Sequence, residues 1–319
     1  MLDILGYAAF FLTTALTYAI ICLGLNIQWG MTGLFNVGVA GFVAIGAYVS
    51  ALLTTPETIG RFGGFGLPII VGWGAAMVVS GLAAGLVGAV TLRLRADYLA
   101  ITTFGIAVTI QLIALNAQAL TGGPFGIGFI PRPFADWADR PLLFNGAHLL
   151  VTGAVALALF WALERLARSP WGRVLRAIRE DEAAAASLGK SPQRYRLQAF
   201  VLGGAIMGLA GAIQAHFIGF IAPDNYLSAL TFLVWTMLVV GGSGNNRGAV
   251  LGAVSVWGLW SASGYLMSSL LPSEFQARGA SLQIVAVGVI LAVILLIRPR
   301  GILGEEKLVS RHIRGLTDS

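Results

Sequence analysis

The chain has 319 residues, of which 57% are hydrophobic and 11% are charged, and its net charge is +6. A soluble domain carries about 25% charged residues, so this composition excludes an ordinary soluble protein. The net positive charge does not indicate nucleic-acid binding, because the cations segregate to one side of the predicted membrane spans. The single cysteine, Cys22, excludes a disulfide framework and paired-thiol chemistry.

Apolar segments of about 20 residues recur along the chain, and each is long enough to cross a bilayer as a helix. The alternating segments of about ten residues that are typical of a membrane β-barrel do not occur in the sequence. We therefore predict an all-α, polytopic helical membrane protein with about nine transmembrane helices (eight to ten) in one domain over residues 1–319. The predicted spans, in chain order, are Ile4–Leu25, Gly33–Thr54, Gly66–Leu92, Tyr98–Leu120, His148–Leu166, Ala199–Ile221, Ser228–Gly244, Gly248–Leu271 and Ser281–Ile297.

Lysine and arginine are distributed unequally between the two sides of these spans. Arg61, Arg132, Arg140 and Arg278 fall on one side, and the other sixteen of the 20 fall opposite. Because loops rich in Lys and Arg stay in the cytoplasm, this predicts a cytoplasmic C-terminus and, with nine spans, a periplasmic N-terminus. A broken or additional helix near Asn26–Gly33 would change the number of spans.

Residues 168–198 form a charged cytoplasmic segment between two apolar spans. Pro170 is suited to the first turn of a helix, and Gly189 followed by Pro192 is typical of a helix end, so we predict one helix between them. Its apolar positions keep helical spacing and share a stripe with Asp181. They are Val174, Ile178, Ala185 and Leu188.

Cations precede anions along this predicted helix, an order that opposes the helix dipole. A short helix with an apolar stripe and a charged rim is suited to docking in a groove of another protein. The alternative is a helix that lies on anionic lipid headgroups.

Carriers driven by ion gradients usually keep an ionisable residue near the middle of the membrane. Here Asp97, Glu164 and Arg165 lie at the ends of spans, and we interpret His216 as a hydrogen-bonded imidazole near the outer end of the sixth span. Gly189-Lys190-Ser191 is not a phosphate-binding loop, since Ala184 replaces the required first glycine. We find no catalytic triad and no metal-binding spacing, so we expect neither enzymatic activity nor nucleotide binding.

Six motifs spread over most of the chain can be compared with known families. They are Gly24–Gly30 with Thr32–Leu34, Gly46–Tyr48, Arg93–Ile101, Leu120–Pro124, Ser169–Glu182 and Arg298–Gly301. Together they resemble the permease subunit of bacterial branched-chain amino acid ABC importers, the LivM family.

This resemblance implies a multi-pass permease subunit of the bacterial inner membrane, embedded in lipid, with no catalytic residue and no cofactor of its own. Its implied partners are a second homologous permease, two ATPase subunits that hold ATP and Mg, and a periplasmic binding protein facing the loop at residues 121–147. The cytoplasmic segment at residues 168–198 would couple to the ATPases. The implied coupling residues are Arg173, Arg176, Ile178, Arg179, Glu180, Asp181, Glu182, Ala183, Leu188 and Gly189.

The coupling segment departs from the family's usual EAA pattern. Glu182-Ala183-Ala184 is followed by four residues, rather than three, before Gly189. We still expect this loop to couple to the ATPases, but the family's pattern does not predict its individual contacts.

The implied substrates are Leu, Ile and Val, with aromatic amino acids as an alternative. Permeases for urea and short amides are similar, although Val39 stands where those relatives often carry a polar residue. An autonomous secondary carrier is the alternative from another functional class.

Polar side chains within or beside the spans are candidates for the substrate path, because a zwitterion needs hydrogen-bond partners in hydrocarbon. For each of them the alternative is a hydrogen bond that holds helices together. Asn36 is the preferred candidate because it lies in the glycine-rich run Gly33–Gly46. The candidates are Asn26, Gln28, Asn36, Gln111 and Asn116.

Overall fold

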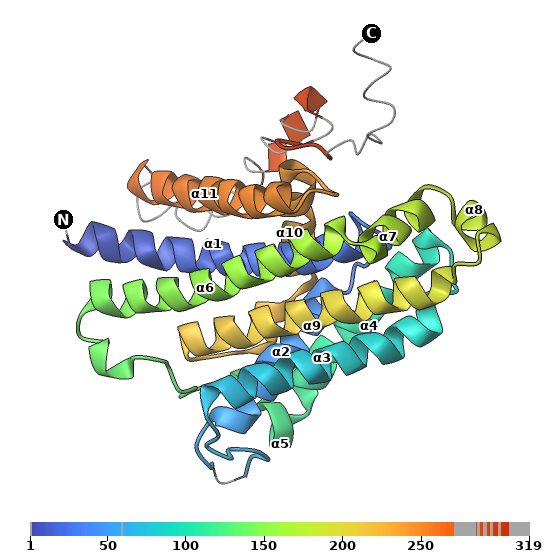
Figure 1. Cartoon of the computed structure of the whole chain (residues 1–319). Helices are drawn as coiled ribbons and strands as arrows, with labels where there is room; N and C mark the ends of the chain where they lie inside the picture. The colour runs from blue at the N-terminus through green and yellow to red at the C-terminus, as the bar shows by residue number, and fades with distance from the viewer. Residues whose placement is uncertain are drawn as a thin grey trace.

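The computed structural model describes residues 2–58, 60–270, 285, 288–289, 292–293, 296–298 and 301–305. In these residues the protein is a bundle of helices that run along one another (Figure 1). One isolated antiparallel bridge pairs Ile127 with Ile221. The helices are α1 Leu2–Gln28, α2 Val39–Thr54, α3 Ile69–Thr91, α4 Ala96–Asn116, α5 Gln118–Thr121, η1 Gly123–Phe125, η2 Ala135–Trp137, α6 Pro141–Arg168, α7 Pro170–Glu180, α8 Glu182–Ser187, α9 Pro192–Ile218, η3 Pro223–Tyr226, α10 Ser228–Gly241 and α11 Asn246–Leu270.

Seven of the described helices are long and apolar enough to cross a membrane, where α10 is counted together with η3. They correspond to seven of the nine predicted spans, and they confirm an all-helical, multi-pass protein. The second predicted span, Gly33–Thr54, has the wrong start, because α2 begins only at Val39 and has 16 residues. The ninth, Ser281–Ile297, lies mostly outside the described residues, so the total of nine and the orientation of the termini remain predictions.

The fifth predicted span also starts too late. We expected His148 to follow a long loop, but α6 begins at Pro141. Proline fits the first helical turn because the amide hydrogen that it lacks has no helical partner there. Residues 122–140, together with η1 and η2, therefore form the connection between α5 and α6.

The core lies where α1, α2 and α9 pack together. In the most apolar windows of α1 and α9, 67% and 72% of the residues are buried, whereas α6 and α11 bury only 22%. The outer helices α3, α4, α6 and α11 therefore expose apolar side chains such as Leu86 and Leu150, as expected of helices that face lipid.

Glycine allows α2 and α9 to approach backbone to backbone. A Cβ atom on Gly46 would lie 2.0 Å from the carbonyl oxygen of Gly208, and that oxygen belongs to a rigid helix. Small residues at helix contacts of this kind are typical of membrane bundles.

We expect Gly46→Ala to lower the thermal unfolding temperature of the purified protein by several degrees. Overpacking of a close contact costs about 1–3 kcal/mol. Gly74→Ala in α3 is the matched control, because nothing lies within 4 Å of a Cβ at that position. It should be neutral or slightly stabilising, since alanine favours helix. Equal melting temperatures for the two variants, measured with a thiol-independent dye, would contradict the close α2–α9 contact.

The two ends of the bundle differ in charge. α7 and α8 lie at one end, together with the connection at residues 242–245, and α5 and the start of α1 lie toward the other (Figure 1). Arg61 contacts Thr55, and Arg132 donates to the carbonyl of Ile218, so both lie at the end away from α7. These two arginines thus lie at the end opposite the charged segment, as the sequence predicts.

Candidate functional site: the α7–α8 face and the polar groups beneath it

The charged segment that we predicted to be cytoplasmic forms two short helices, α7 and α8, instead of the single helix that we predicted. Ser169 caps α7, since its side-chain oxygen accepts from the amide of Gly172 at 3.4 Å. At Asp181 the backbone is extended (φ −150°, ψ 104°), and its carboxylate accepts from the amide of Ala184 at 2.9 Å. Asp181 is therefore the N-cap of α8, and this capping ends the continuous helix.

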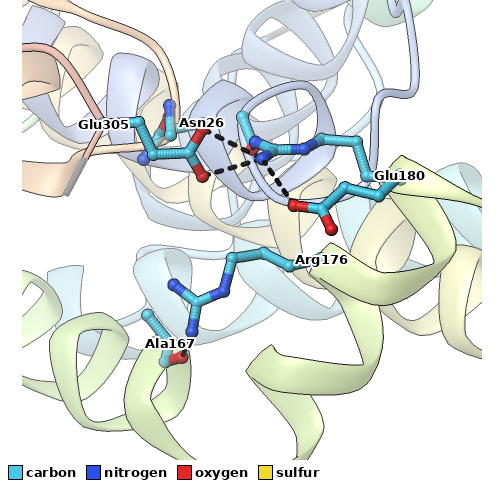
Figure 2. A network of polar contacts seen from close by, with 8 residues as sticks. Asn26, Ala167, Arg176, Glu180 and Glu305 are labelled. Carbon is cyan, nitrogen blue, oxygen red and sulfur yellow. Dashed lines mark hydrogen bonds and ion pairs between the residues drawn. The ribbon is translucent and has the colours of Figure 1, made fainter. Parts of the chain in front are cut away.

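The break also changes the interpretation of the charges. Arg176 donates to the carbonyl of Ala167 at 2.8 Å (Figure 2), and Arg173 donates to that of Arg168 at 3.2 Å. These arginines stabilise the C-terminal carbonyls of α6, while Asp181 and Glu182 lie at the N-terminus of α8. An order that opposes the dipole of one long helix is thus favourable for two separate helix ends, the C-terminus of α6 and the N-terminus of α8.

One side of α7 and α8 packs on the bundle. Leu175 and Ile178 are buried, and Ala185 is buried on α8. Trp171 Nε1 donates to Gln198 Oε1 of α9 at 2.8 Å. The break divides the predicted apolar stripe. Its four residues do not share one buried face, since Val174 is half-buried and Leu188 is 80% exposed.

The ten predicted coupling residues therefore fall into two groups. Arg176, Ile178 and Arg179 turn toward the bundle and are buried or half-buried. The other seven form an exposed surface, which we call the outer face of α7–α8. It consists of Arg173, Glu180, Asp181, Glu182, Ala183, Leu188 and Gly189.

Arg179 connects α7 to distant parts of the chain. Its Nη2 atom lies 2.8 Å and 2.9 Å from the two carboxylate oxygens of Glu305, and its Nη1 atom donates to the carbonyl of Gly30. Glu180 approaches the same guanidinium at 4.0 Å (Figure 2). Arg179 therefore links α7 both to the segment that follows α1 and to residues 301–305.

Asn26, a candidate path residue, lies near the C-terminal end of α1 and is fully buried. Its Oδ1 atom accepts from the amide of Gly244 at 2.8 Å, and its Nδ2 atom donates to Asn246 Oδ1 at 2.9 Å. Asn246 donates in turn to Glu164 of α6 at 3.2 Å. Asn26 thus joins α1 to the α10–α11 connection and, through Asn246, to α6.

Gln28 and Asn36 meet in the interior, next to the irregular connection at residues 29–38. Asn36 Nδ2 donates to Gln28 Oε1 at 2.7 Å, and Asn36 Oδ1 accepts from the amide of Gly38 at 2.7 Å. Gln28 Nε2 donates to the carbonyl of Phe200 in α9 at 2.9 Å. Both side chains are fully buried, so in this conformation their amides bind protein groups.

Irregular backbone within a membrane protein needs partners for its polar groups, and here they come from other helices. The amide of Val37 donates to Thr103 of α4, and the amide of Ala40 donates to Thr231 of α10, both at 3.0 Å. Trp235 Nε1 donates to the carbonyl of Asn36 at 2.9 Å. The sequence analysis did not single out these three side chains; their only local signal is a polar group within an apolar helix.

Gln111 and Asn116 do not join this cluster through any contact described here. Both lie on α4, where Gln111 is half-buried and Asn116 is exposed. Asn116 donates to the carbonyl of Leu112 on its own helix at 2.8 Å.

His216 is hydrogen-bonded, as we expected, and its side chain is fully buried near the C-terminal end of α9. Its Nε2 atom lies 2.9 Å from the hydroxyl of Ser50, and its Nδ1 atom lies 2.7 Å from the carbonyl of Pro131. It therefore links α2 and α9 to the connection between α5 and α6. Among the described residues, no group of three His, Cys, Asp or Glu could hold a metal ion.

Residues 7–297 match the family described as the permease component of the branched-chain amino acid transport system. The chain belongs to this permease family. No solved structure matches it.

Three relatives illustrate the permease family's range. The high-affinity branched-chain amino acid transport system permease protein LivM of Salmonella typhimurium is 34% identical, and the alignment covers 95% of this chain and 72% of that protein. LivM of Escherichia coli K12 is 36% identical over 76% of this chain and 60% of its own length. A probable LivM of Methanocaldococcus jannaschii is 27% identical over 92% of both chains. These relatives are transport permeases, which confirms the resemblance drawn from the motifs.

Proposed function

We propose that this permease is a subunit of an ATP-driven importer of branched-chain amino acids in the bacterial inner membrane. It would form half of the translocation path beside a second homologous permease. ATP and Mg would be held by two ATPase subunits, and a periplasmic binding protein would deliver the substrate. The observation that carries the proposal is the outer face of α7–α8, which is charged, exposed and built on helices anchored to the bundle.

The outer face is suited to a partner because its exposed leucine is not used to pack α7 and α8 on the bundle. Leu188 is 80% exposed, whereas Leu175 and Ile178 make the apolar contacts to the bundle. An exposed apolar side chain beside a short amphipathic helix is suited to docking in a hydrophobic groove on another protein. Closure of an ATPase pair would push on this surface and move α7 and α8 as a unit.

The cluster of Gln28 and Asn36 supports the position of the path. Broken backbone that is buried in protein at the depth of a membrane recurs at transporter substrate sites. In the proposed cycle, displacement of residues 29–38 would free the Asn36 amide to bind the zwitterionic substrate.

The test is ATP-dependent uptake of labelled leucine into proteoliposomes that hold this chain, a homologous permease, the ATPases and the binding protein. We expect uptake that disappears without ATP. Urea is measured in parallel, and uptake of urea instead of leucine would replace the substrate but retain the importer class. Uptake by the single chain under an ion gradient would contradict the proposal.

A further inference from the structure

The guanidinium of Arg179 binds three separate groups, and Glu305 is the best placed of them. Glu305 meets Arg179 through both carboxylate oxygens, at 2.8 Å and 2.9 Å, and its side chain is 35% exposed. Glu180 is 4.0 Å away and 75% exposed, so solvent screens it. Both oxygens accept from the same nitrogen, Nη2, while the carbonyl of Gly30 accepts from Nη1, so the guanidinium is held at two of its nitrogens.

Residues 301–305, which we call the strap, are themselves fixed to the end of α10. The amides of Ile302 and Leu303 donate to the carbonyls of Val240 and Gly241 at 2.8 Å and 2.9 Å. Asn245 Nδ2 donates to the carbonyl of Gly304 at 3.2 Å. The carboxylate of Glu305 is therefore held on a segment that moves with α10.

The third partner of Arg179, the carbonyl of Gly30, belongs to the turn that ends α1. A Cβ on Gly30 would lie 2.5 Å from the amide nitrogen of Gly244, so this turn and the α10–α11 connection are in direct contact. Asn26 also binds Gly244. This turn and Asn36 belong to the same irregular connection, residues 29–38. A movement of Arg179 thus acts on the segment that leads to the buried amide cluster.

We propose that Glu305 is a positioning residue for coupling: it holds Arg179 on the Gly30 carbonyl, so that movement of α7 is transmitted to α1 and α10. This inference rests on the proposed function. It adds Glu305, which is 126 positions from Arg179, to the predicted coupling residues. It also gives the strap a role in coupling. In Figure 2, dashed lines join the labelled Glu305 and Glu180 to one guanidinium.

The test compares Glu305→Gln with Asp97→Asn, which removes the same charge from an exposed residue at the start of α4. In the reconstituted transporter, we expect Glu305→Gln to lower leucine uptake per ATP hydrolysed about fivefold or more while hydrolysis stays within twofold. Asp97→Asn should leave this ratio unchanged, and Glu305→Asp should restore most of it. Arg179→Gln removes every contact of the guanidinium and should lower the ratio at least as far as Glu305→Gln. Adding Glu305→Gln to Arg179→Gln should lower it no further, because the carboxylate acts through the arginine.

A second measurement does not depend on the substrate or on any partner. Hydrogen exchange on the isolated chain should show that Glu305→Gln exposes the amides of residues 170–180 and 29–33 together, relative to Asp97→Asn. Unchanged exchange and an unchanged ratio would overturn the role of Glu305. Parallel losses of uptake, hydrolysis and assembly would overturn it too, because they indicate a structural role only. Failure of leucine uptake in the unmodified transporter, with the exchange result as expected, would instead count against the proposed function.

Discussion

Leu188→Asp should reduce ATP-driven leucine uptake at least tenfold while the helical bundle stays folded. Leu188 is 80% exposed, so the change removes little packing within the chain. In the proposed importer this side chain enters an apolar groove on the ATPase, and a buried carboxylate there would lack a partner. Loss of an interface anchor costs about 2 kcal/mol or more, and every 1.4 kcal/mol is a tenfold change in binding.

The matched control is Leu94→Asp, which introduces the same charge at an exposed leucine in the connection between α3 and α4. We expect its uptake to remain within twofold of the unmodified protein. Co-purification of the ATPase with each variant separates lost docking from lost transport. Wild-type uptake and docking for Leu188→Asp would show that the outer face of α7–α8 is not the docking surface.

Asn36→Leu should both destabilise the permease and reduce uptake at least tenfold. The substitution leaves the amide of Gly38 and the Oε1 atom of Gln28 without their present partners in a fully buried site. Each unpaired group costs about 1–3 kcal/mol, and Leu cannot bind a substrate ammonium or carboxylate. Thermal unfolding in detergent and uptake per assembled complex would be measured on the same preparation.

Gln118→Leu is the control for Asn36→Leu, because it removes an amide from an exposed position on α5. Its stability and uptake should both be close to those of the unmodified protein. If Asn36→Leu lowers stability but each folded complex still imports leucine normally, Asn36 only holds the helices together and the substrate path lies elsewhere.

Hydropathy predicted the long helices well, because a bilayer imposes a minimum length on every apolar span. It could not locate the start of α2. The apolar and glycine-rich run from Gly33 onward has the composition of a span, but residues 33–38 are irregular. The amide of Val37 binds Thr103, and the amide of Ala40, in the first turn of α2, binds Thr231. Those partners lie far away in sequence, so no local pattern reveals that a helix is unnecessary there.

The break at Asp181 could have been predicted from the sequence. An aspartate followed by glutamate and a run of alanine is a typical helix start. The apolar spacing from Val174 to Leu188 favoured one continuous helix instead, and the exposure of Leu188 shows that this spacing was misleading. Glu305 is different, because its contact with Arg179 joins residues separated by 126 positions.

The strap has a consequence for biosynthesis. Its amides bind the last carbonyls of α10, and its carboxylate binds Arg179, so these contacts form only after the ribosome has added residue 305. α7 and α8 are made more than a hundred residues earlier, but until then α7 lacks its contact to the strap. A chain that stops before the strap would present the outer face on a loosely held α7. In the proposed importer, the strap would thus distinguish a chain that has reached residue 305 from a shorter one before an ATPase engages it.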